Sequence, residues 1–503
     1  MLSIVLLTII SALLVFCAIF HFSGNREVFK KISNIPGPRA FPLLGCISLL
    51  VGDAAHFAEE ILNMCNIYTS PFRVILGTRV FIIFKNPDQI RSVLQNPNAI
   101  EKDYIYKFAK PWLGNGLVLA DNKIWRVHRR LIQPTFNQKI LQSFVGIFHK
   151  NALSLTQSMK ENVDGPEFEL TTNILFTTFS NICESSMGIT VESKREEIMN
   201  YFTATQRVLN LLFERLVRVW LHSDTIFNLS ELSRGFYEGI KKAHNFTDEV
   251  IREKKEYLKT LADENDENDE PRRKPTLELL LELTDNEHVL SDQDLRDEVL
   301  TVIFAGSDTT ARTLDCLFLM LAQHPQIQDK VYEEIFNIYG TDDPEDNPVK
   351  SEDLPSLQYL ERVIKETMRL FPAAPMVARE VQADFEIDGY TIPKGCAVSA
   401  SIISLHRDEK YWPDPLKFDP DRFLPEEVHK RHPLAYMPFL FGSRDCIGRV
   451  YAVMSMKVIT ATFLRKYILI KEKITEIKDM KIKTDALLRL ADPVTVRIEK
   501  RVK

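Results

Sequence analysis

The longest helical pattern in the sequence does most to limit how this chain can fold. It begins near Ser291, where Ser291 and Asp294 resemble a capping box with Asp in place of the usual Glu or Gln, and it ends at Pro325. A helix of about 33 residues would be about 50 Å long at the usual rise per residue. Because the middle of this segment is apolar, we expect the helix to run through the core of a large helical domain.

The middle of this helix carries the sequence Ala305-Gly306-Ser307-Asp308-Thr309-Thr310. Glycine and hydroxylated residues are poor helix formers, so something other than helix propensity selected them. Gly306 would let the helix bulge and open a space, beside which Thr309 could hydrogen-bond a ligand and Asp308 could pass protons. The alternative is that these residues serve only helix packing.

The cysteines are scattered, odd in number and without a CxxC motif, which argues against a disulfide framework and against a zinc site. Cys446 has a distinctive setting in FLFGSRDCIG, because Gly442 permits a turn and a helical pattern starts at Ile447. It therefore lies at a helix N-terminus, where amide groups and the helix dipole favour a thiolate, the form that binds iron. The seven cysteines are Cys17, Cys46, Cys65, Cys183, Cys316, Cys396 and Cys446.

Phe439, Gly442, Arg444, Cys446 and Gly448 match every fixed position of FxxGxRxCxG, the haem-binding signature of the cytochrome P450 family. The resemblance to this family runs from residue 36 to residue 448. It implies a mainly α fold with small β-sheets, in which a haem b lies between the long central helix and the cysteine loop. It also implies that Cys446 binds the iron and that Phe439, Arg444 and Gly448 bind the cofactor. The 305–310 segment would then be the oxygen-activation motif, with Asp308 and Thr309 as catalytic residues.

Further residues resemble cofactor ligands of the family. Trp125 and Arg129 share one helix face in KIWRVHRRL, and both are donors suited to a carboxylate. The family uses such a WxxxR pair on a haem propionate. Arg379 and Arg444 resemble two more propionate ligands.

A buried ionic triad is also implied by the resemblance. Glu366 and Arg369 lie three residues apart in KETMRLFP and can pair on one helix face. In the family this ExxR pair is joined by an arginine from a later PxRF segment, which here is Arg422. We expect the triad to fix the loop that precedes the cysteine rather than to add stability.

Within the family the sequence looks like the fatty-acid ω-hydroxylase clan, particularly its insect branches. Many members of that clan have Glu just before the Gly of the oxygen-activation motif, and this Glu can esterify the haem. This chain has Ala305 there, so we expect Cys446 to be the only covalent attachment of the cofactor.

Substrate contacts would come from segments that match the family's recognition regions. These segments are largely apolar, which favours a lipophilic substrate such as a fatty acid, a terpenoid or hormone, or a xenobiotic. The candidate pocket residues are Val302, Ala305, Val377 and Leu487. The segments are 108–118, 202–213, 300–309, 373–377 and the turn near 487–488.

The N-terminus resembles a membrane anchor. Residues 1–20 contain no charge and are long enough to span a bilayer, and Arg26, Lys30 and Lys31 follow on what would be the cytosolic side. A cleaved signal peptide is the alternative. We expect an anchor at 1–22, a proline-rich hinge at 23–45 and one catalytic domain at 46–503, held in the cytosol on the endoplasmic reticulum membrane.

Strand patterns are short. Phe72–Phe84 alternates in the manner of a hairpin with Gly77 near its turn, and helical patterns dominate from about Asn122 onward.

The formal net charge of -6 argues against a nucleic-acid binder. Basic residues nevertheless cluster on the segment around Trp125 and beside the cysteine, on what the family uses as its proximal face. A basic patch there would dock an acidic electron donor. The implied partner is NADPH–cytochrome P450 reductase, with cytochrome b5 open as a second donor. The basic residues are Lys123, Arg126, His128, Arg130 and Arg449.

The sequence therefore predicts a haem-thiolate monooxygenase that uses O2 and reductase electrons. A reductase-independent isomerase or dehydratase is one alternative, and its members usually lack the distal Thr. A non-enzymatic haem sensor is another, and it would leave Asp308 and Thr309 without a role.

Overall fold

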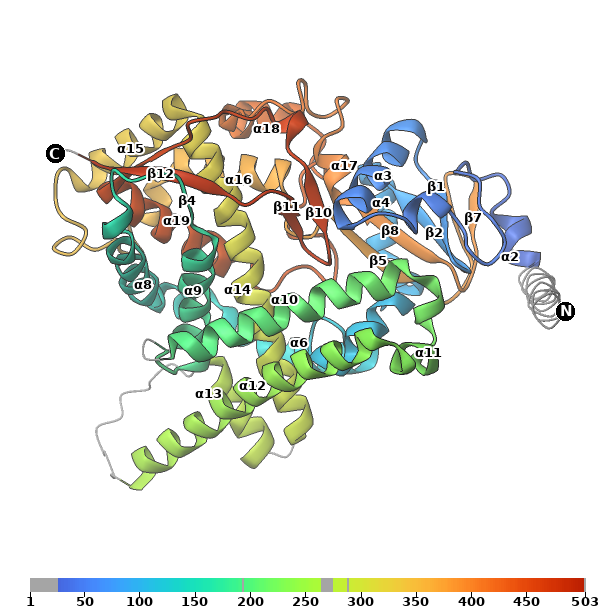
Figure 1. Ribbon diagram of the computed structural model, residues 1–503, viewed down its shortest axis with the longest axis horizontal. Coiled ribbons are helices and arrows are strands. Elements are labelled where there is room, and N and C mark those ends of the chain that lie inside the picture. The colour runs from blue at the N-terminus through green and yellow to red at the C-terminus, as the bar shows by residue number, and fades with distance from the viewer. Residues whose placement is uncertain (1–25, 192–193, 264–274, 287–288, 502–503) are drawn as a thin grey trace, which may run out of the picture.

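The computed structural model describes residues 26–191, 194–263, 275–286 and 289–501, and this part of the chain is mainly helical with small sheets, as expected (Figure 1). Helices fill most of the molecule and surround α14, whereas the largest sheet lies at the side where the described chain begins. The helices are α2 (Arg26–Lys31), α3 (Ala54–Ile67), α4 (Pro87–Gln95), α5 (Lys110–Leu113), α6 (Asn122–Ile132), α7 (Gln138–Ser143), α8 (Val145–Ser158), α9 (Thr171–Ile182), α10 (Arg195–Val217), α11 (Asp224–Leu229), α12 (Glu231–Asp263), α13 (Thr276–Leu281), α14 (Asp292–Gln323), α15 (Pro325–Tyr339), α16 (Gln358–Leu370), α17 (Ile402–His406), α18 (Pro425–Lys430) and α19 (Arg449–Lys466).

The largest sheet has the strand order β1-β2-β8-β5-β3, in which β2 and β8 are parallel and the other neighbours antiparallel. The predicted hairpin is confirmed, because β1 and β2 pair across a turn at Gly77, whose φ of 62° favours glycine. A second sheet has the order β4-β12-β9, and β6–β7 and β10–β11 form hairpins. The strands are β1 (Phe72–Leu76), β2 (Arg79–Phe84), β3 (Glu101–Lys102), β4 (Phe168–Glu169), β5 (Met376–Glu380), β6 (Phe385–Ile387), β7 (Tyr390–Ile392), β8 (Ala397–Ser401), β9 (Tyr467–Ile470), β10 (Ile482–Thr484), β11 (Leu488–Leu490) and β12 (Thr495–Lys500).

The predicted central helix is α14, and both halves of its predicted capping box are present. The Ser291 hydroxyl accepts from the Asp294 amide at 3.1 Å, and the Asp294 carboxylate accepts from the Ser291 amide at 3.0 Å. The helix packs against α9, α12, α16 and α19. Its residues are buried on every side from Asp297 to Gln323, apart from three considered below. This complete enclosure explains the apolar composition of the segment.

The predicted anchor at 1–22 lies outside the described residues, and in the described part of the chain no helix is both long and apolar enough to span a bilayer. The middle of the predicted hinge segment is fixed against β1. The Arg73 amide donates to the Pro36 carbonyl at 2.7 Å, the Arg73 guanidinium donates to the carbonyls of Ile32 and Ile35, and Ile35 is fully buried. These contacts hold this part of the predicted hinge in one position.

Candidate functional site

The loop before α19 presents Cys446. The Cys446 amide donates to the Phe439 carbonyl at 3.0 Å, and Gly442 turns the chain with a φ of 89°. A Cβ at Gly442 would lie only 2.8 Å from the Leu94 carbonyl oxygen, so a larger residue would displace the loop. Helix α19 begins at Arg449 with Gly448 as its N-cap, close to the predicted start. Cys446 therefore lies just before a helix N-terminus, as expected.

Cys446 differs from the other described cysteines, because it is exposed and they are buried. Burial among the surrounding loop atoms nevertheless raises the pKa of the Cys446 thiol, while the Gly448 amide N–H and the charges of Arg129 and Arg449 act to lower it. The Cys446 side chain is accessible although many protein atoms surround it, so it lies in a hollow rather than on a protruding surface. Within the described residues, no group of three or more His, Cys, Asp or Glu side chains gathers as a metal site.

A cluster of positive charge, formed by Lys102, Arg379 and Arg444, contributes to the same region. Lys102 and Arg379 are direct cross-strand partners on β3 and β5. The Arg444 guanidinium lies over the Trp125 ring, 4.7 Å from its centroid, and donates to the Ala120 carbonyl at 2.8 Å. Its Nε and Nη1 are buried, and no described residue accepts from them. Like charges placed opposite each other in a sheet are unfavourable, so this cluster suits an anionic ligand.

Burial and the neighbouring positive charges lower the pKa values of Lys102 and Arg444. Burial first, and then the charges of Arg379 and Arg444, hold the pKa of the Lys102 ammonium well below its usual value. Burial and the Arg379 charge lower the pKa of Arg444 to about 10. No carboxylate of the described residues forms an ion pair with Lys102, and Glu101 is 3.9 Å from Arg444. Lys102 could not be predicted from the sequence, because a two-residue strand is too short to form a recognisable pattern.

Arg129, which is predicted to bind a haem propionate, contacts the cysteine loop, and its role at the propionate stays a prediction. Its guanidinium donates to the Asp445 carbonyl at 2.8 Å and to the Asp445 carboxylate at 2.9 Å. This bidentate contact ties α6 to the residue that precedes Cys446. The structure thus brings Trp125, Arg379 and Arg444 together and places Arg129 on the cysteine loop.

The predicted distal motif is the accessible part of α14. Among residues 297–323, only Ala305, Gly306 and Thr309 keep appreciable exposure, and they share one face of the helix. The Thr309 hydroxyl donates to the Ala305 carbonyl at 2.7 Å, which leaves its oxygen free to accept another hydrogen bond. Asp308 is buried, and burial raises the pKa of its carboxyl. One of its oxygens receives the Gln206 amide at 3.4 Å, and its Oδ2 has no partner among the described residues.

The expected bulge at Gly306 is wrong, because α14 is continuous α-helix through this residue. A Cβ at Gly306 would lie 2.6 Å from Cδ1 of Ile182 on α9. The glycine therefore permits close packing of two helices, which the sequence of α14 alone cannot reveal.

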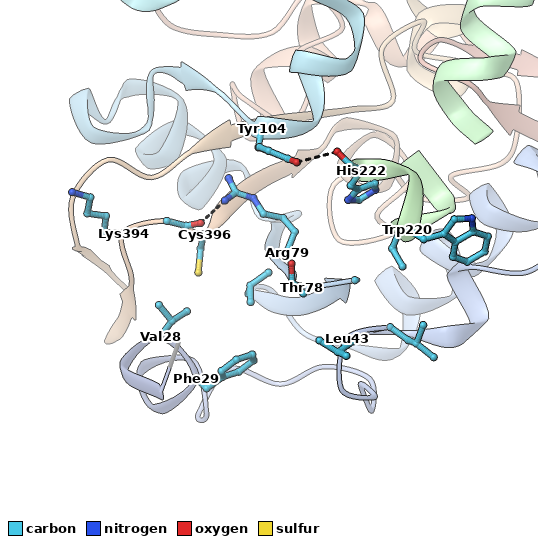
Figure 2. A pocket seen from close by; sticks show the side chains of 15 residues that line it. Val28, Phe29, Leu43, Thr78, Arg79, Tyr104, Trp220, His222, Lys394 and Cys396 are labelled. Carbon is cyan, nitrogen blue, oxygen red and sulfur yellow. Dashed lines mark hydrogen bonds between the residues drawn. The ribbon is translucent and has the colours of Figure 1, made fainter. Parts of the chain in front are cut away.

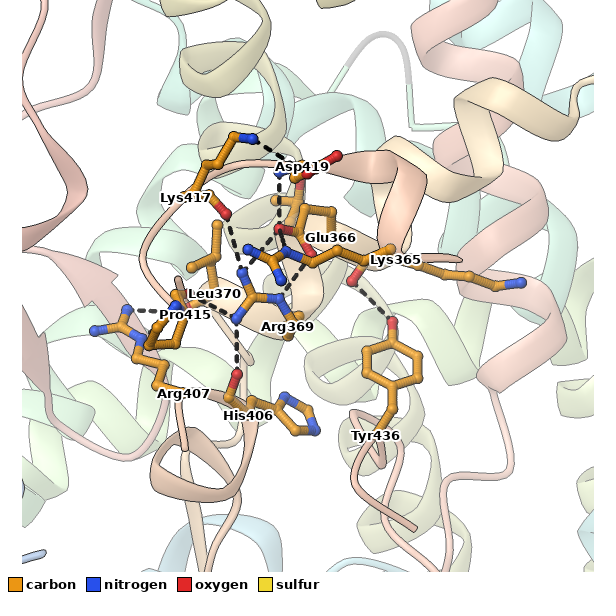
Figure 3. Close-up of polar contacts among 12 residues, drawn as sticks. Lys365, Glu366, Arg369, Leu370, His406, Arg407, Pro415, Lys417, Asp419 and Tyr436 are labelled. Carbon is orange, nitrogen blue, oxygen red and sulfur yellow. Dashed lines mark hydrogen bonds and ion pairs between the residues drawn. The ribbon is translucent and has the colours of Figure 1, made fainter. Parts of the chain in front are cut away.

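The structure brings the three residues of the expected triad together, and Figure 3 shows Glu366 and Arg369 among their polar contacts. The fully buried Arg369 donates to both oxygens of Glu366, at 2.7 and 2.8 Å, and Arg422 lies 3.5 Å from Glu366. Arg369 also donates to the carbonyls of His406, Pro415 and Lys417. One arginine thus organises the segment between α17 and the PxRF residues (Figure 3).

The triad connects to the cysteine loop through His406. Its carbonyl accepts from Arg369, and its Nε2 accepts from the Met437 amide at 2.9 Å. An Nε2 that accepts a hydrogen bond requires a neutral ring. Consistently, burial and then the Arg369 charge lower the pKa of His406 to about 3. Phe439, two residues after Met437, holds the Cys446 amide.

An apolar cavity of about 270 Å³ lies between the large sheet, α3, α10 and the β10–β11 turn. Val377 lines it, as do parts of the predicted recognition segments 108–118, 202–213 and 373–377. Val302, Ala305 and Leu487 are not among its lining residues, although Leu487 follows the lining residues 484–486. Helix α3 adds side chains that the sequence did not predict: Phe57, Ala58, Ile61 and Leu62.

The expected basic patch needs one correction. Lys123, Arg126, Arg130 and Arg449 are exposed, but His128 is buried and lies 2.7 Å from Glu298 of α14. His128 therefore joins two helices and cannot contact a partner.

Comparison of the sequence with known protein families identifies the family of this chain. Residues 35–498 match the cytochrome P450 family, so this chain belongs to the cytochrome P450 family. It is accordingly a monooxygenase whose cofactor is a thiolate-ligated haem.

Similar proteins extend over nearly the whole chain. Cytochrome P450 4c3 of Drosophila melanogaster is 31% identical over 98% of this chain and 94% of its own length. Cytochrome P450 4c21 of Blattella germanica is 32% identical over 97% of both chains, and human cytochrome P450 4V2 is 31% identical over 98% of this chain and 95% of its own. The crystal structure of the cytochrome P450DA haem domain shares the fold, with a TM-score of 0.77 at 24% identity, over 93% of this chain and 98% of that chain.

The residues described above fit this cofactor. Haem b carries two carboxylates, and the unpartnered Arg444 nitrogens, Arg379 and Lys102 offer donors and charge for them. Cys446 offers an accessible sulfur. Ala305 has no carboxyl group, so it cannot form an ester with the haem.

Proposed function

We propose that this enzyme inserts one oxygen atom of O2 into a lipophilic substrate, with electrons that pass from NADPH through cytochrome P450 reductase. The observation that carries the proposal is the accessible face of α14, where Ala305, Gly306 and Thr309 are the only residues of the segment 297–323 that are not buried. When bound, the haem supplies the activation of O2. The Cys446 thiolate would ligate its iron, and Trp125, Arg379, Arg444 and Lys102 would hold its propionates.

The protein's own part in the reaction is to move protons at that face. Thr309 can accept or donate a hydrogen bond through a hydroxyl already anchored to Ala305. Asp308 lies one residue away with an unpartnered Oδ2, and its raised pKa lets it hold a proton more readily than an exposed carboxyl. The proton path therefore ends at Thr309 and is fed by Asp308.

The substrate class follows from the apolar cavity. Its lining is dominated by aliphatic and aromatic side chains, with few polar groups such as Thr484 and Asp485. Such a lining favours fatty acids, terpenoids, hormones or lipophilic toxins over polar compounds. Several relatives carry the name cytochrome P450 4, which agrees with the resemblance to the fatty-acid ω-hydroxylase clan.

Attachment to the endoplasmic reticulum membrane is part of the proposal, with an anchor at 1–22 ahead of α2. The exposed Trp220 lines a cavity of about 600 Å³ together with Val28 and Phe29 of α2 (Figure 2). The exposed Leu44 also lines this cavity. Apolar groups beside the first described helix suit contact with lipid. Alkaline carbonate extraction of membranes should leave the full chain in the pellet, and release into the supernatant would contradict the anchor.

Two measurements test the reaction. The reduced carbon monoxide adduct should have the spectrum of a thiolate-ligated haem, and a spectrum typical of histidine ligation would contradict the Cys446 assignment. Thr309→Ala should divert NADPH electrons into hydrogen peroxide, and tight coupling in that variant would remove Thr309 from the proton path. Binding spectra with fatty acids, terpenoids and plant toxins would identify the substrate class. Turnover of a lipid hydroperoxide without NADPH, in the absence of monooxygenase activity, would favour the isomerase alternative.

A further inference from the structure

Helix α14 carries charges that the proposed reaction does not use. Arg312 and Asp315 are buried in the core, four and seven residues after Asp308. Arg312 Nη2 lies 3.4 Å from Asp308 Oδ1. Seven residues make about two helical turns, or about 10 Å, so the two carboxylates share one face with Arg312 between them. Burying a charged side chain is unfavourable unless the charge is paired, so the burial of Asp308, Arg312 and Asp315 needs a physical explanation.

A polar cavity of about 150 Å³ opens onto this row, and both Arg312 and Asp315 line it. Its other walls come from α9, β4 and the chain around β10 and β11, and they carry charge of both signs. A polar space of this size has room for several water molecules. The polar side chains that line it from these elements are Glu169, Thr171, Lys483, Arg489 and Asp492.

Both carboxylates have an oxygen free for a proton or for water. Asp315 Oδ1 and Asp308 Oδ2 are buried without a hydrogen-bond partner among the described residues. Burial raises the pKa of Asp315 to about 7, although Arg312 and Thr171 act to lower it and Asp308 and Glu169 act to raise it. The Asp315 carboxyl is therefore more readily protonated than an exposed aspartate.

This polar cavity is kept apart from the apolar one. Arg489 faces the polar cavity and pairs with Asp485, which lines the apolar cavity. Arg489 also donates to Gln206 at 3.3 Å, and Gln206 donates to Asp308 Oδ1 at 3.4 Å. A hydrogen-bonded wall thus separates the space for water from the space for a lipophilic molecule.

The geometry points to the polar cavity as the inlet for solvent protons, with Asp315 as the group that takes them up and Arg312 as the link to Asp308. This inference rests on the proposed role of Asp308 and Thr309. A proton leaves water in the cavity, binds an Asp315 oxygen, and passes through intervening water to Asp308, while no electron moves. Arg312 stays protonated throughout and acts by shifting between the two carboxylates.

The test uses the holoenzyme with reductase, NADPH and laurate as probe, and measures the fraction of NADPH electrons recovered as hydrogen peroxide. In Asp315→Asn this fraction should rise several-fold, the solvent isotope effect on NADPH oxidation should increase, and the pH dependence of the wild-type fraction near neutral pH should flatten. The carbon monoxide spectrum should not change. Asp329→Asn makes the same chemical change at an exposed site on α15 and should match the wild type.

The outcomes separate the two proposals. If Thr309→Ala raises the peroxide fraction and Asp315→Asn does not, the inlet is refuted and the proposed reaction stands. If neither variant changes it, the proton role of Asp308 and Thr309 fails, and the inlet fails with it. Should Asp315→Asn misfold, the double variant Arg312→Gln/Asp315→Asn removes both charges. A wild-type peroxide fraction that does not change across neutral pH would also refute the inlet, and it requires no variant.

Discussion

Replacing Arg369 with lysine tests how strongly α16 holds the segment in front of the cysteine loop. The Arg369 guanidinium is fully buried and donates to both Glu366 oxygens and to three backbone carbonyls. A lysine nitrogen has three donors at a single point and cannot reach all five acceptors. Leaving a buried carboxylate and carbonyls without partners costs about 3–5 kcal/mol, a large part of the 5–15 kcal/mol that typically stabilises a domain.

The assay is urea unfolding of the holoenzyme, together with the carbon monoxide spectrum. Arg369→Lys should lower the urea midpoint strongly and reduce the thiolate-type spectrum, because Arg369 reaches Cys446 through His406, Met437 and Phe439. Arg362→Lys is the matched control, because Arg362 is on the same helix, is partly exposed and lies 3.7 Å from Asp421. That pair should contribute about 1 kcal/mol or less. Equal effects of the two variants would refute the reasoning.

Two other predictions concern the cofactor and pH. Lys102→Met removes one hydrogen-bond donor from the charge cluster. Because a hydrogen bond to a charged group usually contributes about 1.5–3 kcal/mol, this variant should transfer haem to apomyoglobin about ten- to hundredfold faster. Lys107→Met is the control, and equal transfer rates in the two variants would remove Lys102 from the propionate site. His406 has its pKa lowered from 6.5 to about 3, so the unfolded chain binds a proton that the fold excludes, and stability is lost as pH falls through this range. The free energy of unfolding should fall by at most about 1.4 kcal/mol per pH unit. In His406→Asn the urea midpoint should fall less steeply as the pH is lowered. A fall as steep as that of the wild type would contradict the neutral His406 ring.

Features that depend on a local sequence pattern could be predicted from the sequence. The limits and cap of α14, the turn at Gly442 and the position of Cys446 before α19 follow from periodicity, capping chemistry and a ten-residue motif. Features that depend on distant partners could not be read in this way. Gly306 packs against Ile182 of α9, and Lys102 joins the charge cluster only because β3 pairs with β5.

The same limit explains the outcomes for α6. Its helical face was predictable, and Trp125 and Arg129 do share it. However, the partner of each side chain is set by other elements, because Arg129 contacts Asp445 and His128 contacts Glu298 of α14. A charged residue on an amphipathic helix reveals its face but not whether that face meets solvent or another helix.

The geometry of α14 explains how one helix can serve an apolar and a polar task. At about 100° per residue, Ala305, Gly306 and Thr309 form one stripe, and Asp308, Arg312 and Asp315 form a second stripe about 100° away. The first stripe keeps the accessible surface, and the second meets the polar cavity and the Arg489 network. Asp308 belongs to the charged stripe and is the sequence neighbour of Thr309, so it is the natural connection between the two. Because the Arg489–Asp485 pair separates the cavities, side chains of the apolar cavity can change with substrate while the charged stripe stays intact.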